Sequence, residues 1–68
     1  MILSTREQAI NFGIYAIETD RRLDDLNHDA LIGELMHSIR LVFGGYTFET
    51  CDLEHIAEVA VQHYNEAA

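Results

Sequence analysis

The 68-residue sequence has no lysine, no proline and no tryptophan, and its single cysteine is Cys51. One cysteine excludes an intramolecular disulfide and favours a reducing, intracellular setting. No run approaches the roughly 20 apolar residues that a membrane span requires, and residues 1–3 are too short for a signal peptide. We therefore expect residues 1–68 to form one cytoplasmic domain. Its stability should be marginal, because a chain of this size buries only about 60% of its unfolded surface.

Positive charge is also scarce. Twelve carboxylates face four arginines, and the formal net charge is -8. Binding to DNA, RNA or anionic membranes requires a basic patch, so these are excluded as direct partners. Such acidity favours a cationic partner, or a surface that imitates a polyanion. The alternative is that the charge only keeps a small protein soluble.

Three segments carry apolar residues at helical spacing. They lie at about residues 5–21, 28–43 and 53–65. The middle segment has the most continuous apolar face, an arc of about 140°, so we expect the other helices to pack on it. Residues 46–50 alternate apolar and polar, which predicts a short extended segment with Tyr46 and Phe48 turned inward and residues 1–3 as its candidate strand partner. The expected fold is mainly all-α, a small three-helix domain with an extended segment before the last helix.

The ends of these helices carry their own sequence signals. The expected N-caps are Ser4, in a capping box with Glu7, then Asn27 or Asp29, and finally Thr50 or Asp52. Gly44 and Gly45 should end the second helix, because glycine accepts the left-handed conformation at which helices stop.

The first helix has a wider apolar arc than a three-helix domain needs. Ile10, Ile14 and Ile17 make an ordinary core stripe. The arc continues through Ala9, Phe12, Gly13 and Ala16, and Tyr15 lies just beyond it. Either the third helix covers this extra edge or a partner does. The candidate apolar contact residues are Ala9, Phe12, Tyr15 and Ala16.

The glycine at position 13 calls for an explanation, since glycine lowers helix stability by about 1 kcal/mol relative to alanine. A close helix crossing at this point would supply one.

The polar face of the third helix carries Glu54 and Glu58 one turn apart, with no cation between them. Other carboxylates cluster around the start of the second helix. The candidate acidic contact residues are Glu54, Glu58, Asp24, Asp25, Asp29 and Glu34. Arg21 and Arg22 are bracketed by aspartates, so they make a poor nucleic-acid patch.

A partial calcium-loop pattern occurs at Asp25, Asn27 and Asp29. Ala30 stands where the loop needs glycine for its sharp turn, and Met36 stands where a bidentate glutamate is required. Without these two residues the oxygen cage does not close, so we expect no calcium site.

Zinc binding is the other metal hypothesis, through Cys51, His55 and His63 with His28 or His37 as the fourth ligand. His55 and His63 differ by about 80° on the helical wheel, and the paired short spacings of structural zinc sites are missing. We expect no metal and no cofactor.

Catalysis has little support in the sequence. Cys51 near a helix start with His55 one turn later is a common chance pair, and the chain has little room for a pocket of even about 300 Å³. A helix-turn-helix is also rejected. The link between the second and third helices is too long, and the expected reading helix opens with carboxylates that phosphates repel.

Two functional hypotheses remain. The first is a small acidic inhibitor or regulator, of the kind that phages and mobile elements encode, which occupies a basic, often nucleic-acid-binding, surface of a larger protein. The second is a structural or assembly module, a homodimer or small subunit, that docks through the apolar face of the first helix. Salt separates the two, because electrostatic docking weakens as ionic strength rises.

Overall fold

Three α-helices and one short 3-10 helix make up most of the computed structural model, which describes residues 4–67 apart from the side chain of residue 67. These elements are α1 (Thr5–Thr19), η1 (Arg21–Asp25), α2 (His28–Phe43) and α3 (Thr50–Ala67). No strand occurs within residues 4–67. The all-α class is confirmed, while the suggested pairing with residues 1–3 lies outside the described residues.

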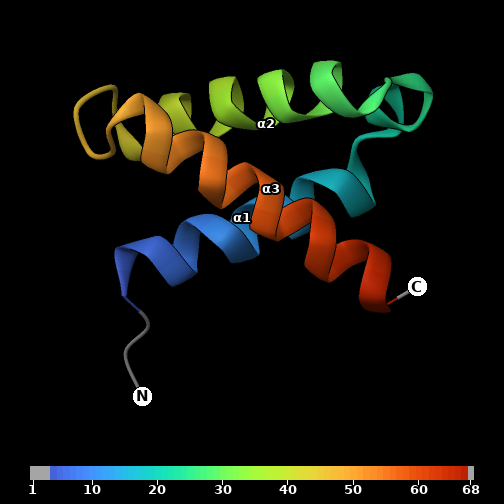
Figure 1. The fold of residues 1–68 in the computed structure, drawn as a ribbon, viewed down its shortest axis with the longest axis horizontal. Coiled ribbons are helices and arrows are strands. Elements are labelled where there is room, and N and C mark those ends of the chain that lie inside the picture. The colour runs from blue at the N-terminus through green and yellow to red at the C-terminus, as the bar shows by residue number, and fades with distance from the viewer. Residues whose placement is uncertain (1–3, 68) are drawn as a thin grey trace.

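Helix α3 is the element on which the other helices pack. It runs diagonally across both α1 and α2 (Figure 1). It supplies five of the buried apolar side chains, which are Leu53, Ile56, Ala57, Ala60 and Val61. The expectation that the second helix would have this central role is wrong. The apolar face of α2 is long, but only one side of this helix packs against the rest of the chain. The small residues of α3 let a second helix approach closely, so α3 packs against both α1 and α2.

Helices α1 and α3 approach each other closely at Gly13. A Cβ atom built on Gly13 would lie 2.8 Å from the Cβ of Ala60. This distance is too short for any real side chain, so the close crossing that the sequence suggested at Gly13 is confirmed. The buried centre of α1 is therefore Ala9, Gly13 and Ile17. Of the expected stripe of isoleucines only Ile17 lies at this centre, whereas Ile10 and Ile14 are half-buried at its edge.

The core divides into two clusters along the helices. One contains Leu23 of η1 with residues of all three helices, namely Ile17, Ile32, Leu35, Ala57 and Val61. The other contains Ala9, Ile39, Leu53 and Ile56. Met36 packs against both clusters and joins them.

Three phenylalanines close the second cluster on one side. The ring centroids of Phe12 and Phe43 are 6.0 Å apart, and those of Phe43 and Phe48 are 6.3 Å apart. Both pairs have the edge-to-face geometry that aromatic rings prefer. The inward position expected for Phe48 is therefore confirmed, since it is half-buried against this cluster.

Two of the three expected N-caps are present. The Ser4 hydroxyl accepts a hydrogen bond from the Glu7 backbone N–H at 3.2 Å, and the Asn27 side chain accepts one from Ala30 N–H at 2.8 Å. The third expectation is wrong, because α3 begins at Thr50. The Glu49 carbonyl accepts the first helical bond, from Leu53 N–H at 2.9 Å, so Glu49 holds the cap position.

The first helix is shorter than expected because Asp20 ends it. The Asp20 side chain accepts from the backbone N–H of Arg22, which starts η1. Local bonds of this kind compete with continuation of a helix.

The segment between α2 and α3 forms a turn and a bend at residues 45–48, and Thr50 already belongs to α3, so the short extended segment expected at residues 46–50 is wrong. Gly44 ends α2 with a φ of 95°, as the sequence predicted, and the Thr47 N–H donates to its carbonyl at 3.4 Å. The Thr47 hydroxyl donates to the Phe43 carbonyl. Within this turn Tyr46 is 104% exposed, so the prediction that it turns inward is wrong. The chain reverses here, which directs Tyr46 away from the core.

The tight crossing predicts opposite effects at two helical glycines. Gly13→Ala should lower the free energy of unfolding by about 1–3 kcal/mol, because the new methyl group overpacks against Ala60. Gly33→Ala, where nothing lies within 4 Å of the new Cβ, should raise it by about 0.5–1 kcal/mol. Urea unfolding of both variants measures the difference. Equal stabilisation by the two alanines would show that α1 and α3 do not cross tightly.

Candidate functional site

The carboxylates dominate the surface. All twelve lie within the described residues, and eleven of them are exposed. Asp20 forms the one ion pair between side chains of residues 4–66, with Arg22. The other eleven carboxylates form no ion pair within these residues and all of them are exposed, so a binding partner would find them available.

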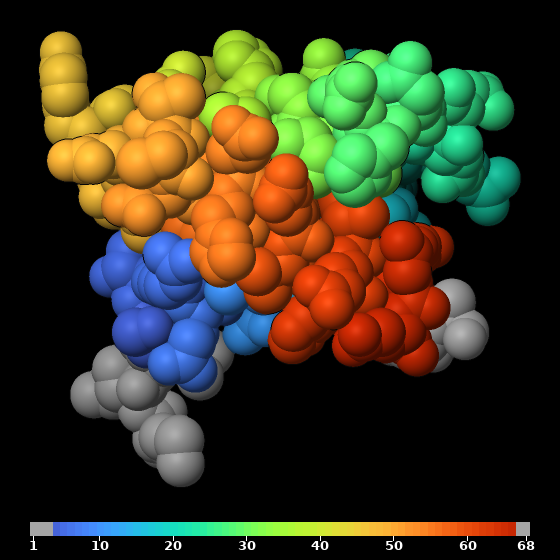
Figure 2. Space-filling view, in the orientation of Figure 1, coloured from blue at the N-terminus to red at the C-terminus, as the bar shows by residue number. Residues whose placement is uncertain are grey.

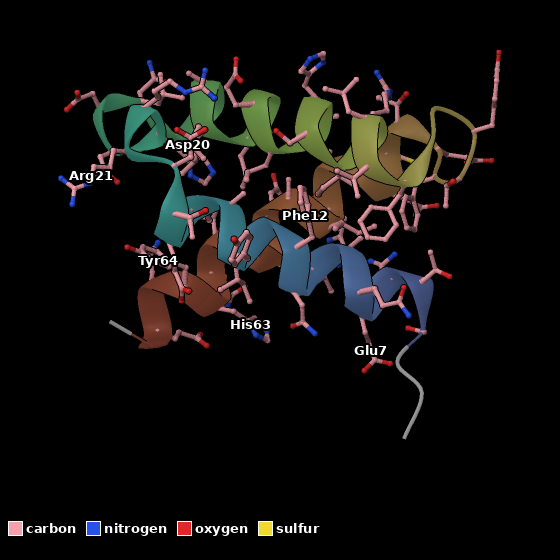
Figure 3. All side chains as sticks on the ribbon, turned by 180° about the vertical axis from the view of Figure 1, so that it is seen from behind. Glu7, Phe12, Asp20, Arg21, His63 and Tyr64 are labelled. Carbon is pink, nitrogen blue, oxygen red and sulfur yellow. The ribbon has the colours of Figure 1, made fainter. Side chains whose placement is uncertain are left out.

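The Asp20–Arg22 pair has bidentate geometry. Arg22 Nε donates to Asp20 Oδ1 at 3.0 Å, and Arg22 Nη2 donates to Asp20 Oδ2 at 2.8 Å. These hydrogen bonds, and the backbone bond from Arg22, lower the pKa of Asp20. The same side-chain hydrogen bonds raise the pKa of Arg22. The pair closes the turn between α1 and η1, and Figure 3 shows Asp20 at this turn.

The six candidate acidic residues are all exposed, but they do not form one patch. Asp24 and Asp25 lie in η1 and Asp29 in the first turn of α2, whereas Glu54 lies near the start of α3. Between these two places runs α2, which has sixteen residues and is about 24 Å long. Asp24, Asp25 and Asp29 therefore lie at one end of α2 and Glu54 near the other, where α3 begins, and we call these places the two acidic ends (Figure 1 shows the elements).

The η1 end holds an open pocket. Arg22, Leu23, Leu26 and Glu34 line it, and its volume is about 210 Å³. Ligand sites for small molecules usually exceed about 300 Å³. This pocket therefore gives no support to a small-molecule site, although it places the candidate Glu34 near Arg22.

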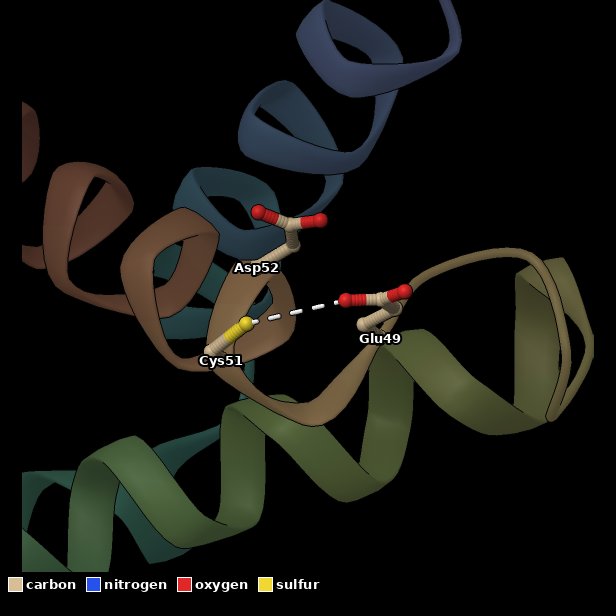
Figure 4. Close-up of side chains that lie close together, drawn as sticks. All are labelled: Glu49, Cys51 and Asp52. Carbon is tan, nitrogen blue, oxygen red and sulfur yellow. Dashed lines mark hydrogen bonds between the residues drawn. The ribbon is translucent and has the colours of Figure 1, made fainter.

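The start of α3 brings three possible metal ligands together. The ligand atoms of Glu49, Cys51 and Asp52 all lie within 4.8 Å of one another (Figure 4). The Cys51 thiol donates weakly to Glu49 Oε2 across 3.9 Å. All three residues are exposed, so their negative charge is solvated and close grouping alone defines no metal site.

This grouping differs from the one considered in the sequence. Cys51 lies with two carboxylates and not with His55 or His63, and all four histidines are exposed. Sequence reasoning missed the group because it looked for histidine partners. The available signal was the spacing Glu-x-Cys-Asp at the start of the last helix.

The candidate apolar residues of α1 lie largely within the chain's own core. Ala9 has no exposed surface, and Phe12 and Ala16 are half-buried. Phe12 lies between α1 and α2 (Figure 3), where it contacts Phe43. Tyr15 is the exception, at 62% exposure. The extra apolar edge of α1 is therefore covered inside the molecule.

Exposed apolar side chains gather instead at the end of α2. Leu41 is 73% exposed, Val42 is 59% exposed and Tyr46 is 104% exposed. The turn that carries Tyr46, yellow in Figure 2, projects from the molecule at the upper left. Sequence reasoning missed this group because it treated the apolar residues of the second helix as one continuous buried face and turned Tyr46 inward.

Comparison with known protein families, curated proteins and solved structures finds no match for this chain. Among the described helices, none is long and apolar enough to cross a membrane. The surface itself is therefore the basis for any functional assignment.

The pKa shift of Asp20 predicts an acid-dependent contribution to stability. A lowered pKa in the folded state stabilises the fold above the unfolded value of about 4, and this contribution disappears as pH falls through the folded value. Asp20→Asn should therefore lower stability slightly at pH 7 and hardly at all near pH 2. Urea unfolding at both pH values measures the effect. Asp24→Asn, which removes an exposed and unpaired carboxylate, is the control; an equal pH dependence in both variants would contradict a special role for the pair.

The internal position of Phe12 predicts a loss of stability that a surface aromatic residue does not share. Phe12→Ala should lower the free energy of unfolding by about 2–4 kcal/mol, because a half-buried ring leaves the contact with Phe43. Tyr15→Ala should change it by less than about 0.5 kcal/mol. Thermal unfolding of both variants measures the difference, and a fully stable Phe12→Ala variant would show that the ring is not part of the core.

Proposed function

We propose that this chain is a small acidic protein-binding regulator that occupies a basic surface of a larger protein, such as a surface that binds nucleic acid. The observation that carries the proposal is the availability of the carboxylates: eleven of the twelve are exposed, and none of these eleven forms an ion pair within the described residues. A protein that needed acidity only for its own fold would pair more of them.

The two acidic ends give this surface an extended form. Carboxylates at η1 and at the start of α3 lie at opposite ends of a helix about 24 Å long. A basic groove that follows a nucleic-acid backbone presents cations over a comparable distance, and the summed field of the acidic protein would speed its approach to such a groove. Occupying the groove would block the nucleic acid, which makes inhibition the expected result.

The core does not depend on these charges. No polar or charged side chain is buried among the described residues. Carboxylates can therefore serve recognition without an effect on packing, and they can be exchanged in experiments while the fold persists.

Docking through α1 has less support. Of its four candidate residues, Ala9, Phe12 and Ala16 contribute to the chain's own core, and Tyr15 alone is exposed. An assembly module that used this face would first have to expose the Phe12–Phe43 contact.

The first test is capture of partners from a host lysate on the tagged full chain, with elution by a salt gradient and identification by mass spectrometry. The proposal expects a nucleic-acid-handling protein that elutes at moderate salt, because screening weakens contacts between exposed charges. Retention of the same protein at high salt would contradict an electrostatic contact.

Charge reversal then identifies which acidic end makes contact. Glu54→Lys with Glu58→Lys should abolish binding of the captured protein, whereas circular dichroism should show an unchanged fold, since both side chains are exposed. Asp24→Lys with Asp25→Lys is the matched control, because it changes the net charge equally at the other end. Unchanged binding by both double variants would refute the proposed function. Equal loss in both would indicate that the groove contacts both acidic ends.

A further inference from the structure

The exposed apolar group at the end of α2 is the strongest feature that the acidic surface does not explain. Leu41, Val42 and Tyr46 lie within six consecutive residues and are 73%, 59% and 104% exposed. We call these three residues the turn patch. Tyrosine is among the residues that most often dominate binding energy at protein interfaces.

The turn patch is held by a defined backbone. Gly44 has a φ of 95°, and the Thr47 N–H donates to the Gly44 carbonyl at 3.4 Å. On the inner side of the turn, Phe48 packs against Phe43 at a centroid distance of 6.3 Å. Tyr46 is therefore presented from an anchored turn, which reduces the conformational entropy that binding would remove.

The size of the turn patch shows that it is only part of an interface. Three such side chains expose on the order of 400 Å². A stable interface buries about 800 Å² on each partner and surrounds an apolar centre with a polar rim. The occupant must therefore also contact the polar residues around the turn.

The charged residues that flank the turn patch in the sequence are Arg40 before it and Glu49 and Asp52 after it. Glu49 and Asp52 follow the turn, and their carboxylate oxygens lie within 4.8 Å of each other and of the Cys51 thiol. The nearby cation, Arg40, donates to the Thr50 hydroxyl at 3.3 Å. A second copy of this chain would bring the same carboxylates and a further net charge of -8 to the interface. Charge complementarity thus favours a basic occupant over a second copy.

We propose that the turn patch is the apolar anchor of the interface, and that its occupant is a protein surface with arginine or lysine side chains arranged around exposed apolar side chains. The inference rests on the proposed function, to which it adds the place of contact and the chemistry of the partner. Tyr46 and Leu41 supply apolar contact, while Glu49 and Asp52 meet the cations around it.

Synthetic peptides test this chemistry on the intact chain. The first probe is an amphipathic peptide with leucine on one helical face and arginine on the rest. The second has the same composition in scrambled order, so that it keeps the charge but has no apolar face. The third replaces each arginine of the first by glutamate. Fluorescence anisotropy gives each affinity at low salt, and amide chemical shifts locate the contact.

The proposal expects the amphipathic arginine peptide to bind about tenfold more tightly than its scrambled form, with shifts centred on residues 41–52. Tyr46→Ser with Leu41→Ser should remove this difference and leave binding of the scrambled peptide unchanged. Tyr15→Ser, at another exposed tyrosine, is the matched control and should change neither affinity.

Other outcomes overturn the inference in distinguishable ways. Equal, salt-sensitive binding of both arginine peptides, unaffected by the double variant, would refute the anchor and leave the proposed function in place. Failure of every arginine peptide to bind would refute both. Equal binding of the glutamate peptide would refute a basic occupant. Sedimentation equilibrium provides a further test, since a dimer that Tyr46→Ser dissociates would show that a second copy covers the turn patch.

Discussion

The contact between Gly13 and Ala60 sets the geometry of the molecule. Because the backbones of α1 and α3 approach until no further atom fits between them, α3 can bury one side against α1 and still pack against α2. The same approach places Phe12 where it meets Phe43, and so it decides which apolar residues are covered. A core of eleven apolar residues is small, and a wider crossing would leave it open to water.

Packing and charge are separated in this protein. The described core contains apolar side chains only, whereas the carboxylates and the turn patch lie on the outside. The consequence is that small and apolar residues specify the shape, while the exposed surface is left free for the binding role proposed above. Asp20 is an exception, since its side chain both ends α1 and pairs with Arg22.

Much of the fold could be predicted from sequence, because its signals are local. Helical periodicity, the two caps and the end of α2 depend on residues that are neighbours in the sequence, as at Ser4, Asn27 and Gly44. The role of Gly13 depends only on the small size of that residue. The position of Tyr46 depends on how the chain reverses between α2 and α3. The central role of α3 depends on which helix packs against both of the others. Alternation cannot distinguish a strand from an irregular turn of this length. The six candidate acidic residues are all exposed, as their polar helix faces indicated, but their division between two ends requires the length and direction of α2.

The close approach of α1 and α3 also bears on how such a protein would change over evolutionary time. Surface carboxylates can be exchanged or moved with little effect on the core, so sequences that share this fold can soon lose their resemblance at most positions. The residues at the crossing of α1 and α3 cannot be substituted so freely, because a larger residue at position 13 requires more space at position 60. Descendants of a common ancestor would therefore be recognised by two small residues on helices far apart in the chain, and by little else.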